Sequence, residues 1–216
     1  MQFLSRLALA ATLSAVTLSA QAALEARPGG MVYDTVQNIT WLADWNSAQT
    51  SGHTGAGVDA NGTMTWHAAT AWANNLVHGG FDDWRLPTLL NADGTGPCSG
   101  FNCAGSEMGH MFYTEFGATA FQSILAGSNA ANLALFTNVQ SNVYWSGTDY
   151  APIPGYAWLF LTVGGSQGNA AKVNSSLYAV AVRPGDVAAI PEPQTYAMLL
   201  AGLGAVGVAV RRRRPR

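Results

Sequence analysis

The sequence contains few charged residues. Asp, Glu, Lys and Arg make up 10% of its 216 residues, against about a quarter in an ordinary soluble protein. This composition excludes a highly charged disordered chain and a coiled coil. The 24 glycines follow no three-residue period, which excludes collagen. No internal repeat of about 20 to 50 residues is visible.

Positive charge is scarcest in the middle of the chain. Five of the ten basic residues lie in the last six positions, and Arg6 lies near the start. Between residues 23 and 190, four basic residues accompany eleven acidic ones, which leaves a net formal charge of −7. Phosphate contacts need a basic face, so we expect no nucleic-acid partner.

The common catalytic and metal-binding motifs are absent. The sequence has no G-x-S-x-G elbow, no phosphate-binding loop, no dinucleotide fingerprint, no H-E-x-x-H and no D-x-D-x-D-G loop. We therefore expect neither an enzyme nor a resident metal or cofactor. The acidic and amide side chains of 59–62 and 82–83 leave Ca²⁺ as a weak alternative, because Ca²⁺ takes oxygen ligands.

The first 22 residues have the pattern of a secretory signal peptide. Arg6 precedes an apolar run over 7–20, and Ala20-Gln21-Ala22 is a small-residue cleavage site. We expect signal peptidase to cut between Ala22 and Ala23, which would place the mature chain outside the cytoplasm. The alternative is a buried N-terminal helix.

The segment 190–216 has three parts in a fixed order. Pro191, Glu192 and Pro193 come first, an uncharged stretch over 196–210 follows, and the basic tail 211–216 begins with Arg211, Arg212, Arg213 and Arg214. A helix over 196–210 would be about 22 Å long, short of the ~30 Å hydrocarbon core. By the positive-inside rule the arginines stay in the cytoplasm.

This arrangement resembles the PEP-CTERM sorting signal of Gram-negative bacteria, whose tail is processed by an exosortase during export. The resemblance implies export through the inner membrane, transient anchoring by the helix over 196–210, and delivery to the cell surface or extracellular matrix. The alternative is a permanent C-terminal anchor.

Between the two ends, residues 23–189 form one predicted α+β domain, with a core supplied largely by seven tryptophans. The patterns predict strands over 31–34, 39–43, 84–86, 143–146, 156–163 and 177–183, a helix from the N-cap Thr65 through Val77 that ends at Gly79-Gly80, and helical segments over 106–116 and 120–126.

Several blocks in this region resemble the Lcl C-terminal domain family of bacterial secreted proteins. The most specific are Trp84-Arg85-Leu86-Pro87-Thr88 and Tyr144-Trp145-Ser146-Gly147-Thr148, and others are Met31-Val32-Tyr33-Asp34, Gly105-Ser106-Glu107-Met108-Gly109-His110 and Tyr178-Ala179-Val180-Ala181-Val182-Arg183. Similar blocks occur in C-type-lectin-like folds, which include formylglycine-generating-enzyme-like domains. The resemblance implies a C-type-lectin-like single domain with a twisted antiparallel sheet and long loops. The adhesin that names the family binds sulfated sugars, a ligand poorly suited to a body of charge −7.

Cys98 and Cys103 are the two cysteines, with four residues between them. In an oxidising compartment an even count predicts a disulfide, here one that closes a Gly-rich loop. The alternative is a redox or copper-binding pair of the kind that formylglycine-generating enzymes use.

Several residues of these blocks have structural interpretations. We interpret Trp84, Arg85, Leu86, Pro87 and Trp145 as structural, with Arg85 buried and paired with Asp82, Asp83 or a distant carboxylate. Glu107 and His110, at i and i+3, could face one ligand, but two groups do not complete a zinc site. We favour a helix N-terminus where Glu107 complements the dipole and His110 packs or caps.

Asp149, Tyr150, Tyr156 and Trp158 are the candidate ligand-binding residues, because sugars bind on aromatic faces with polar neighbours. For Trp145 and Trp158 the alternative is a place in the core. We expect a non-enzymatic exported protein of the surface or exopolysaccharide matrix that binds a glycan or another surface protein. An enzyme on a formylglycine-generating-enzyme-like scaffold and a purely structural matrix protein are the alternatives.

Overall fold

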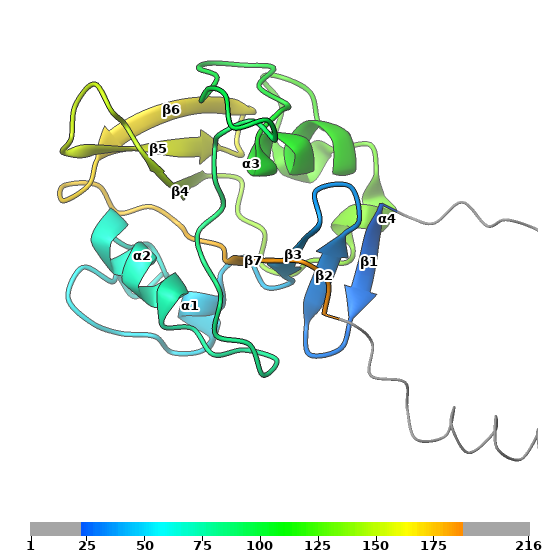
Figure 1. Ribbon diagram of the computed structural model, residues 1–216, viewed down its shortest axis with the longest axis horizontal. Coiled ribbons are helices and arrows are strands. Elements are labelled where there is room, and N and C mark those ends of the chain that lie inside the picture. The colour runs from blue at the N-terminus through cyan, green and yellow to red at the C-terminus, as the bar shows by residue number, and fades with distance from the viewer. Residues whose placement is uncertain (1–22, 188–216) are drawn as a thin grey trace, which may run out of the picture.

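The computed structural model describes residues 23–187 (Figure 1), and this part of the chain is α+β. Its elements are β1 (Leu24–Arg27), β2 (Met31–Asp34), β3 (Ile39–Leu42), α1 (Ser47–Thr50), α2 (Trp66–Asn74), α3 (Glu107–His110), a π-helical turn (Met111–Glu115), a 3-10 turn (Ile124–Ala126), α4 (Ala130–Leu133), β4 (Val143–Asp149), β5 (Tyr156–Leu161), β6 (Ser166–Ala171) and β7 (Val182–Pro184).

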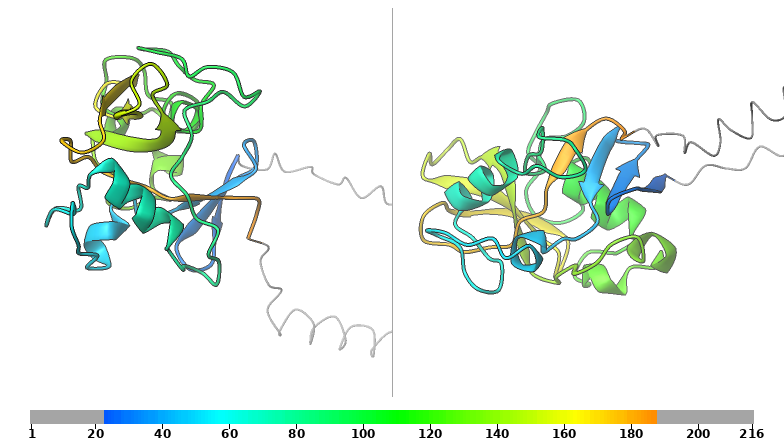
Figure 2. Two further views of the ribbon diagram at one scale, coloured as in Figure 1. Left: turned by 60° about the vertical axis from the view of Figure 1, so that its left-hand side comes forward. Right: turned by 90° about the horizontal axis from the view of Figure 1, so that it is seen from below.

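The strands form two antiparallel sheets rather than one. The first has the order β1-β2-β3-β7, and the second has the order β4-β5-β6. The segment that leads into β7 links them, because Tyr178 bridges Tyr144 of β4 before the chain enters β7. Figures 1 and 2 show this segment running from the second sheet to the first.

The β2–β3 hairpin follows from its turn chemistry. Asp34 pairs with Ile39, and the Asp34 carboxylate accepts the backbone N–H groups of Val36 and Gln37, at 2.9 Å each. This is the local hydrogen bonding through which aspartate favours turns. Asn38 closes the turn at φ 53°, a left-handed conformation that asparagine tolerates. The hairpin thereby fixes Asp34 at the end of β2.

Two hydrophobic clusters form the core, and β3 contributes to both. Ile39 and Trp41 pack with Trp45, Phe112 and other aromatic residues, whereas Leu42 packs with the cluster around Trp145. Six of the seven tryptophans are buried, and Trp66 is half-buried. The tryptophans therefore supply much of the core, as the sequence predicts.

The helix that Thr65 starts is shorter than predicted. The Thr65 side chain accepts from the Ala68 N–H, which confirms the N-cap. The helix ends at Asn74 instead of Gly79. The Asn75 side chain and N–H both donate to the Ala71 carbonyl, and the next N–H, that of Leu76, donates to the Ala73 carbonyl three residues back at 3.2 Å. Val77, expected on the apolar face, is 73% exposed.

Three other sequence predictions need correction. Residues 84–86 form no strand and make a single bridge, Arg85 to Val182, before Pro87 removes the next donor. The helix expected over 120–126 is reduced to the 3-10 turn, since Phe121 lies at φ 68°. Over 177–183, strand pairing is confined to β7 and two single bridges.

The predicted signal peptide (1–22) and sorting segment (190–216) lie outside the described residues. Among residues 23–187, no helix has the length and apolar character needed to cross a membrane.

Candidate functional site

Arg85 and Glu107 form a bidentate ion pair at the start of α3. Arg85 Nη2 and Nη1 donate to Glu107 Oε1 and Oε2 at 2.6 and 2.9 Å. Glu107 Oε2 also accepts the Thr88 N–H at 2.7 Å. Of the three partners expected for Arg85, the structure therefore places a distant carboxylate there. The Arg85 side chain is 38% exposed, so the expectation of a buried guanidinium is wrong.

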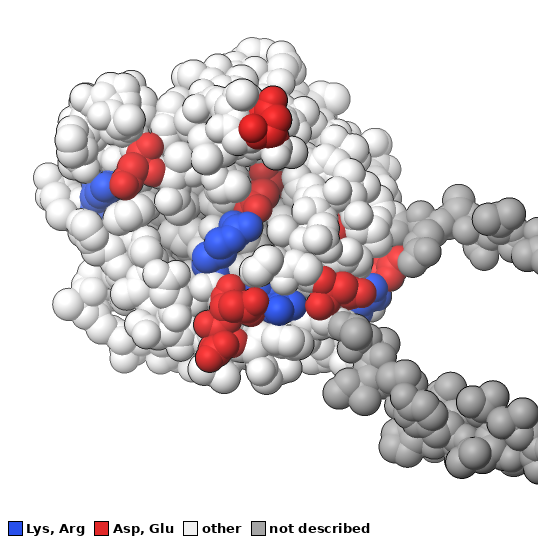
Figure 3. All heavy atoms as spheres, viewed as in Figure 1, with Lys and Arg blue, Asp and Glu red and all other residues white. Residues whose placement is uncertain are grey.

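Asp83 has a different partner from the one expected. Both of its oxygens accept from Arg183, at 2.7 and 3.0 Å, and the Arg183 guanidinium lies 4.0 Å from the Phe81 ring centroid. These hydrogen bonds hold the pKa of Asp83 below its usual range. Figure 3 shows that charged side chains of both signs cluster on this face, within a largely uncharged surface.

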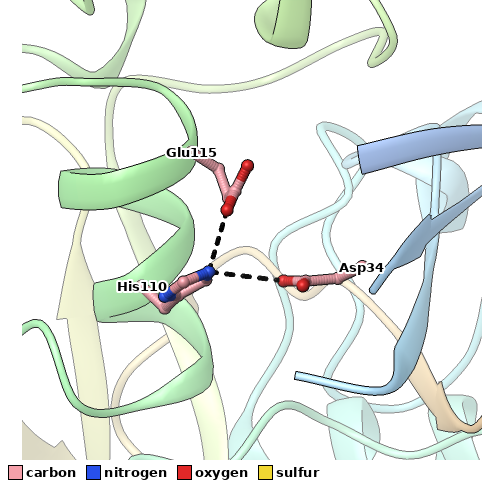
Figure 4. A group of neighbouring side chains, drawn as sticks. All are labelled: Asp34, His110 and Glu115. Atoms are coloured by element: carbon pink, nitrogen blue, oxygen red, sulfur yellow. Dashed lines mark hydrogen bonds and ion pairs between the residues drawn. The ribbon is translucent and has the colours of Figure 1, made fainter. Parts of the chain in front are cut away.

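His110 faces two carboxylates, that of Glu115 in the π-helical turn and that of Asp34 at the end of β2. Its Nε2 lies 2.9 Å from Glu115 Oε1 and 3.8 Å from Asp34 Oδ2 (Figure 4). In an α-helix, residues five apart point about 140° away from each other. The π-helical turn that follows α3 widens the helix and brings Glu115 over His110.

The Asp34–His110–Glu115 cluster is mostly buried. Asp34 is 0% and Glu115 is 3% exposed, and the His110 side chain is 14% exposed. Burial raises the pKa of both carboxyl groups, because the charged forms are removed from water. Sequence reasoning missed Asp34 and Glu115, since neither the π-helical turn nor the proximity of β2 to α3 has a sequence signal.

A groove of about 550 Å³ lies beside the cluster. Its lining comes from the β2–β3 turn, Arg85, the segments 88–92 and 104–107, and His110. His110 therefore belongs both to the lining of the groove and to the carboxylate–histidine cluster.

The structure joins Cys98 and Cys103 in a disulfide with a Cα–Cα distance of 5.6 Å. The closed loop is held against β6, where Gln167 Nε2 donates to the Cys98 carbonyl at 2.6 Å and Gly100 pairs with Gln167. The loop presents Phe101 at its surface.

Phe101 and Phe121 form an exposed aromatic pair, whose ring centroids are 4.1 Å apart. They are 40% and 77% exposed, and Leu125, four residues after Phe121, and Val163, next to Gly164, are about half exposed. The Phe121 N–H donates to the Gly164 carbonyl at 2.8 Å, in the turn between β5 and β6. Phe121 lies at φ 68°, and a left-handed φ is a genuine outlier for a residue this bulky. No sequence signal predicted this pair, because the pattern over 120–126 favoured a helix.

The residues predicted to bind a ligand are only partly available. Trp158 is 8% exposed and packs edge-on against Tyr150 at 5.3 Å, so its ring belongs to the core. Asp149 is exposed but ion-paired with Lys172 at 2.5 Å, and Tyr156 is half-buried in β5. Trp145 is fully buried, and its Nε1 donates to the Met64 carbonyl at 2.8 Å.

Comparison with protein-family models assigns both parts of the chain. Residues 30–183 match the model of the Lcl C-terminal domain. The chain belongs to the Lcl C-terminal domain family. The match contains the Arg85–Glu107 pair, the carboxylate–histidine cluster, the disulfide and both exposed phenylalanines.

Residues 189–214 of this Lcl protein match the model of the PEP-CTERM protein-sorting motif. The motif implies processing by an exosortase, export, and a place at the cell surface or in the extracellular space. No curated protein matches the chain. The two family assignments thus confirm both resemblances drawn from the sequence.

Proposed function

We propose that this Lcl domain is a non-enzymatic binding module of the cell surface or exopolysaccharide matrix, and that it holds a neutral glycan on Phe101 and Phe121. The observation that carries the proposal is the exposed ring pair, 4.1 Å between centroids, with Phe121 held in a left-handed conformation. Strained backbone of this kind persists where the surrounding structure holds it, and it is concentrated at ligand sites.

An exposed aromatic pair suits a sugar because a pyranose ring has apolar C–H faces as well as hydroxyl groups. The negative faces of the phenylalanine rings attract those C–H groups, and the rings shed ordered water when they are covered. Gln122 is exposed next to Phe121 and supplies an amide for the hydroxyl groups. Exposed apolar groups gathered in one place on a soluble domain indicate a binding surface.

The charge of the domain favours a neutral glycan over an acidic one. Residues 23–190 carry a net formal charge of −7, and like charge repels a polyanion at long range. All four cations of this region, Arg27, Arg85, Lys172 and Arg183, are already paired with carboxylates. A sulfated sugar would have to displace one of these partners.

We extend the proposal to a C-type-lectin-like arrangement of the domain. Two antiparallel sheets, and long loops over 51–62 and 89–105 that lie outside the sheets, support it. In this arrangement the loop over 89–105 presents Phe101 beside Phe121, while the sheets fix the ends of the loops.

The test is a glycan array probed with the full chain, with and without Ca²⁺, followed by affinity measurements on the best neutral glycan. Phe121→Ala and Phe101→Ala should each weaken binding about tenfold or more, which corresponds to about 1.4 kcal/mol. Val77→Ala, at another exposed apolar side chain, is the matched control and should bind as the parent does.

Phe121→Gly separates binding from folding. Glycine adopts φ 68° without strain, so this variant should melt within a few degrees of the parent while losing the ring and the ligand. If Phe121→Gly binds like the parent, the aromatic pair is not the site. If the array retains no glycan at all, a purely structural matrix protein becomes the better description.

A further inference from the structure

The geometry points to a site for one divalent transition-metal ion of the zinc type, held by Asp34 Oδ2, His110 Nε2 and Glu115 Oε1. These three atoms lie within 4.8 Å of one another and come from β2, α3 and the π-helical turn. Figure 4 shows both carboxylates directed at the same ring nitrogen. The site does not depend on glycan binding at the aromatic pair.

The strongest indication is an oxygen atom without a partner. Asp34 is 0% exposed, and its Oδ1 accepts two backbone N–H groups. Its Oδ2 is buried as well and has no hydrogen-bond partner among the described residues. A buried carboxylate oxygen left in this way costs free energy, because its hydration is lost and nothing replaces it.

His110 cannot satisfy both carboxylates with one hydrogen. Nε2 carries at most one, and at 2.9 Å it serves Glu115. The 3.8 Å separation from Asp34 Oδ2 is too long for a hydrogen bond. A cation placed among the three atoms would contact all of them, and its charge would offset the two carboxylates.

The distances between the three ligand atoms are close to those of a tetrahedral zinc site. Tetrahedral ligands about 2.0–2.2 Å from Zn²⁺ lie about 3.3–3.6 Å from one another. The separations from His110 Nε2 to Glu115 Oε1 and Asp34 Oδ2, 2.9 and 3.8 Å, fall on either side of that range. Side-chain movements of a fraction of an ångström would equalise them.

The carboxylate oxygens that would not bind the ion, Asp34 Oδ1 and Glu115 Oε2, both accept hydrogen bonds, as is usual for metal ligands. The Asp34 Oδ1 bonds to Val36 and Gln37 fix one carboxylate. Asn132 Nδ2 donates to Glu115 Oε2 at 3.1 Å and also to the Glu115 carbonyl at 2.9 Å, which fixes the other. Such supporting bonds orient ligands and strengthen binding.

The donor set selects the class of metal. One imidazole nitrogen and two carboxylate oxygens suit Zn²⁺ and its first-row neighbours, whereas Ca²⁺ prefers six to eight oxygens. Three protein ligands leave a fourth position, as in zinc sites that bind water or an external group. Because His110 also lines the groove, a water or ligand group could reach that position from the groove.

The test uses the full chain, stripped of metal with a chelator and titrated with Zn²⁺ by calorimetry. We expect one saturable site per chain and a rise in melting temperature with Zn²⁺. Co²⁺ should give a visible d–d absorption typical of four-coordinate nitrogen and oxygen ligation. His110→Ala should abolish both signals, and His67→Ala, which removes an exposed histidine of α2, should leave them unchanged.

Two further variants keep the test valid if His110→Ala folds poorly. Asp34→Asn preserves shape and should melt no lower than the metal-free parent, since a buried charge is removed, yet it should lose the Zn²⁺ response. Asn132→Ala should weaken Zn²⁺ binding about 10–100-fold, the usual effect of removing a supporting bond. The metal site would be overturned if Zn²⁺ showed no saturable binding, or if Asp34→Asn bound Zn²⁺ as the parent does. The cluster would then be held by the hydrogen bond between His110 and Glu115.

Discussion

Arg85 joins β7 to α3 through two different parts of one residue. Its backbone exchanges two hydrogen bonds of 2.8 Å with Val182, and its guanidinium binds Glu107 through two more. The Trp84-Arg85-Leu86-Pro87 block thus connects the first sheet to the helix that carries His110. Trp84, Leu86 and Pro87 are buried around it, while the Arg85 side chain reaches the groove.

Arg85→Ala should lower stability moderately. Glu107 would lose both charge-assisted hydrogen bonds although its side chain is only 12% exposed. Solvent around the 38% exposed Arg85 reduces the effect, so we expect a loss of about 1–2 kcal/mol. For a domain of this size that corresponds to about 2–8 °C in melting temperature, measured by circular dichroism.

The matched variants are Arg85→Lys, Glu107→Gln and the double variant. Lysine keeps the charge but not the bidentate fork, so it should recover part of the loss. If the two single losses simply add in the double variant, the pair contributes nothing of its own.

The Cys98–Cys103 disulfide should contribute about 2 kcal/mol by restricting a short loop of the unfolded chain. Reduction should therefore lower the melting temperature by roughly 4–8 °C. Mass spectrometry of the exported protein should find no free thiol. A variant with both cysteines replaced by serine is the control, because its melting must not respond to reductant.

Acid should weaken the Asp83–Arg183 ion pair. The pKa of Asp83 is lowered in the folded protein from a usual value near 3.8, so its contribution is complete above that pH and is lost as pH falls through the lower folded value. At pH 7, Asp83→Asn should melt about 2–4 °C below the parent, since a pair with a 44% exposed carboxylate is worth about 1 kcal/mol.

Thermal melts of both proteins from pH 7 to pH 2 provide the measurement. The two curves should converge at the acid end, where Asp83 itself is protonated. An offset that stays constant over the whole range would mean that the charge of Asp83 does not stabilise the fold.

Neutral replacements of Arg211, Arg212, Arg213 and Arg214 should disturb sorting without changing the domain. By the positive-inside rule we expect these arginines to keep the end of the chain in the cytoplasm, so neutral replacements should remove the stop. Fractionation of cells and the mass of the exported protein would show an unprocessed or misplaced chain. Equal processing at the same destination would contradict the role assigned to this tail.

Local sequence signals predicted the elements that depend on neighbouring residues, such as capped helices. They failed for elements that form only through contacts with distant parts of the chain. Thr65 caps its helix as predicted, and the helical segment expected from Ser106 does begin there, with Ser106 as its N-cap. Strand β6 was missed because SQGNAA has little apolar character, and it forms by pairing with β5. The division into two sheets depends on where residues 177–184 return, which no local pattern records.

The residues of the candidate sites were likewise predicted only in part, because their partners lie far away in the sequence. A distant carboxylate for Arg85 was one of three expected partners, but nothing in the sequence singles out Glu107. Asp34, 76 residues before His110, reaches it only because the hairpin and α3 pack together. Phe121 looked helical, and its exposure follows from a hydrogen bond to Gly164 in a turn formed by later strands.

The strand register also determines how the domain would respond to mechanical force. Leu24 pairs with Asp34, Asp34 with Ile39, and Ile39 with Pro184, so the first and last strands begin and finish at the same end of the first sheet. Tension applied between the start of β1 and the end of β7 would therefore separate these edge strands one residue pair at a time, instead of shearing all their hydrogen bonds together. Phe101 and Phe121 are attached to the β5–β6 hairpin of the other sheet, so the surface of the proposed glycan site would keep its shape while the first sheet yields.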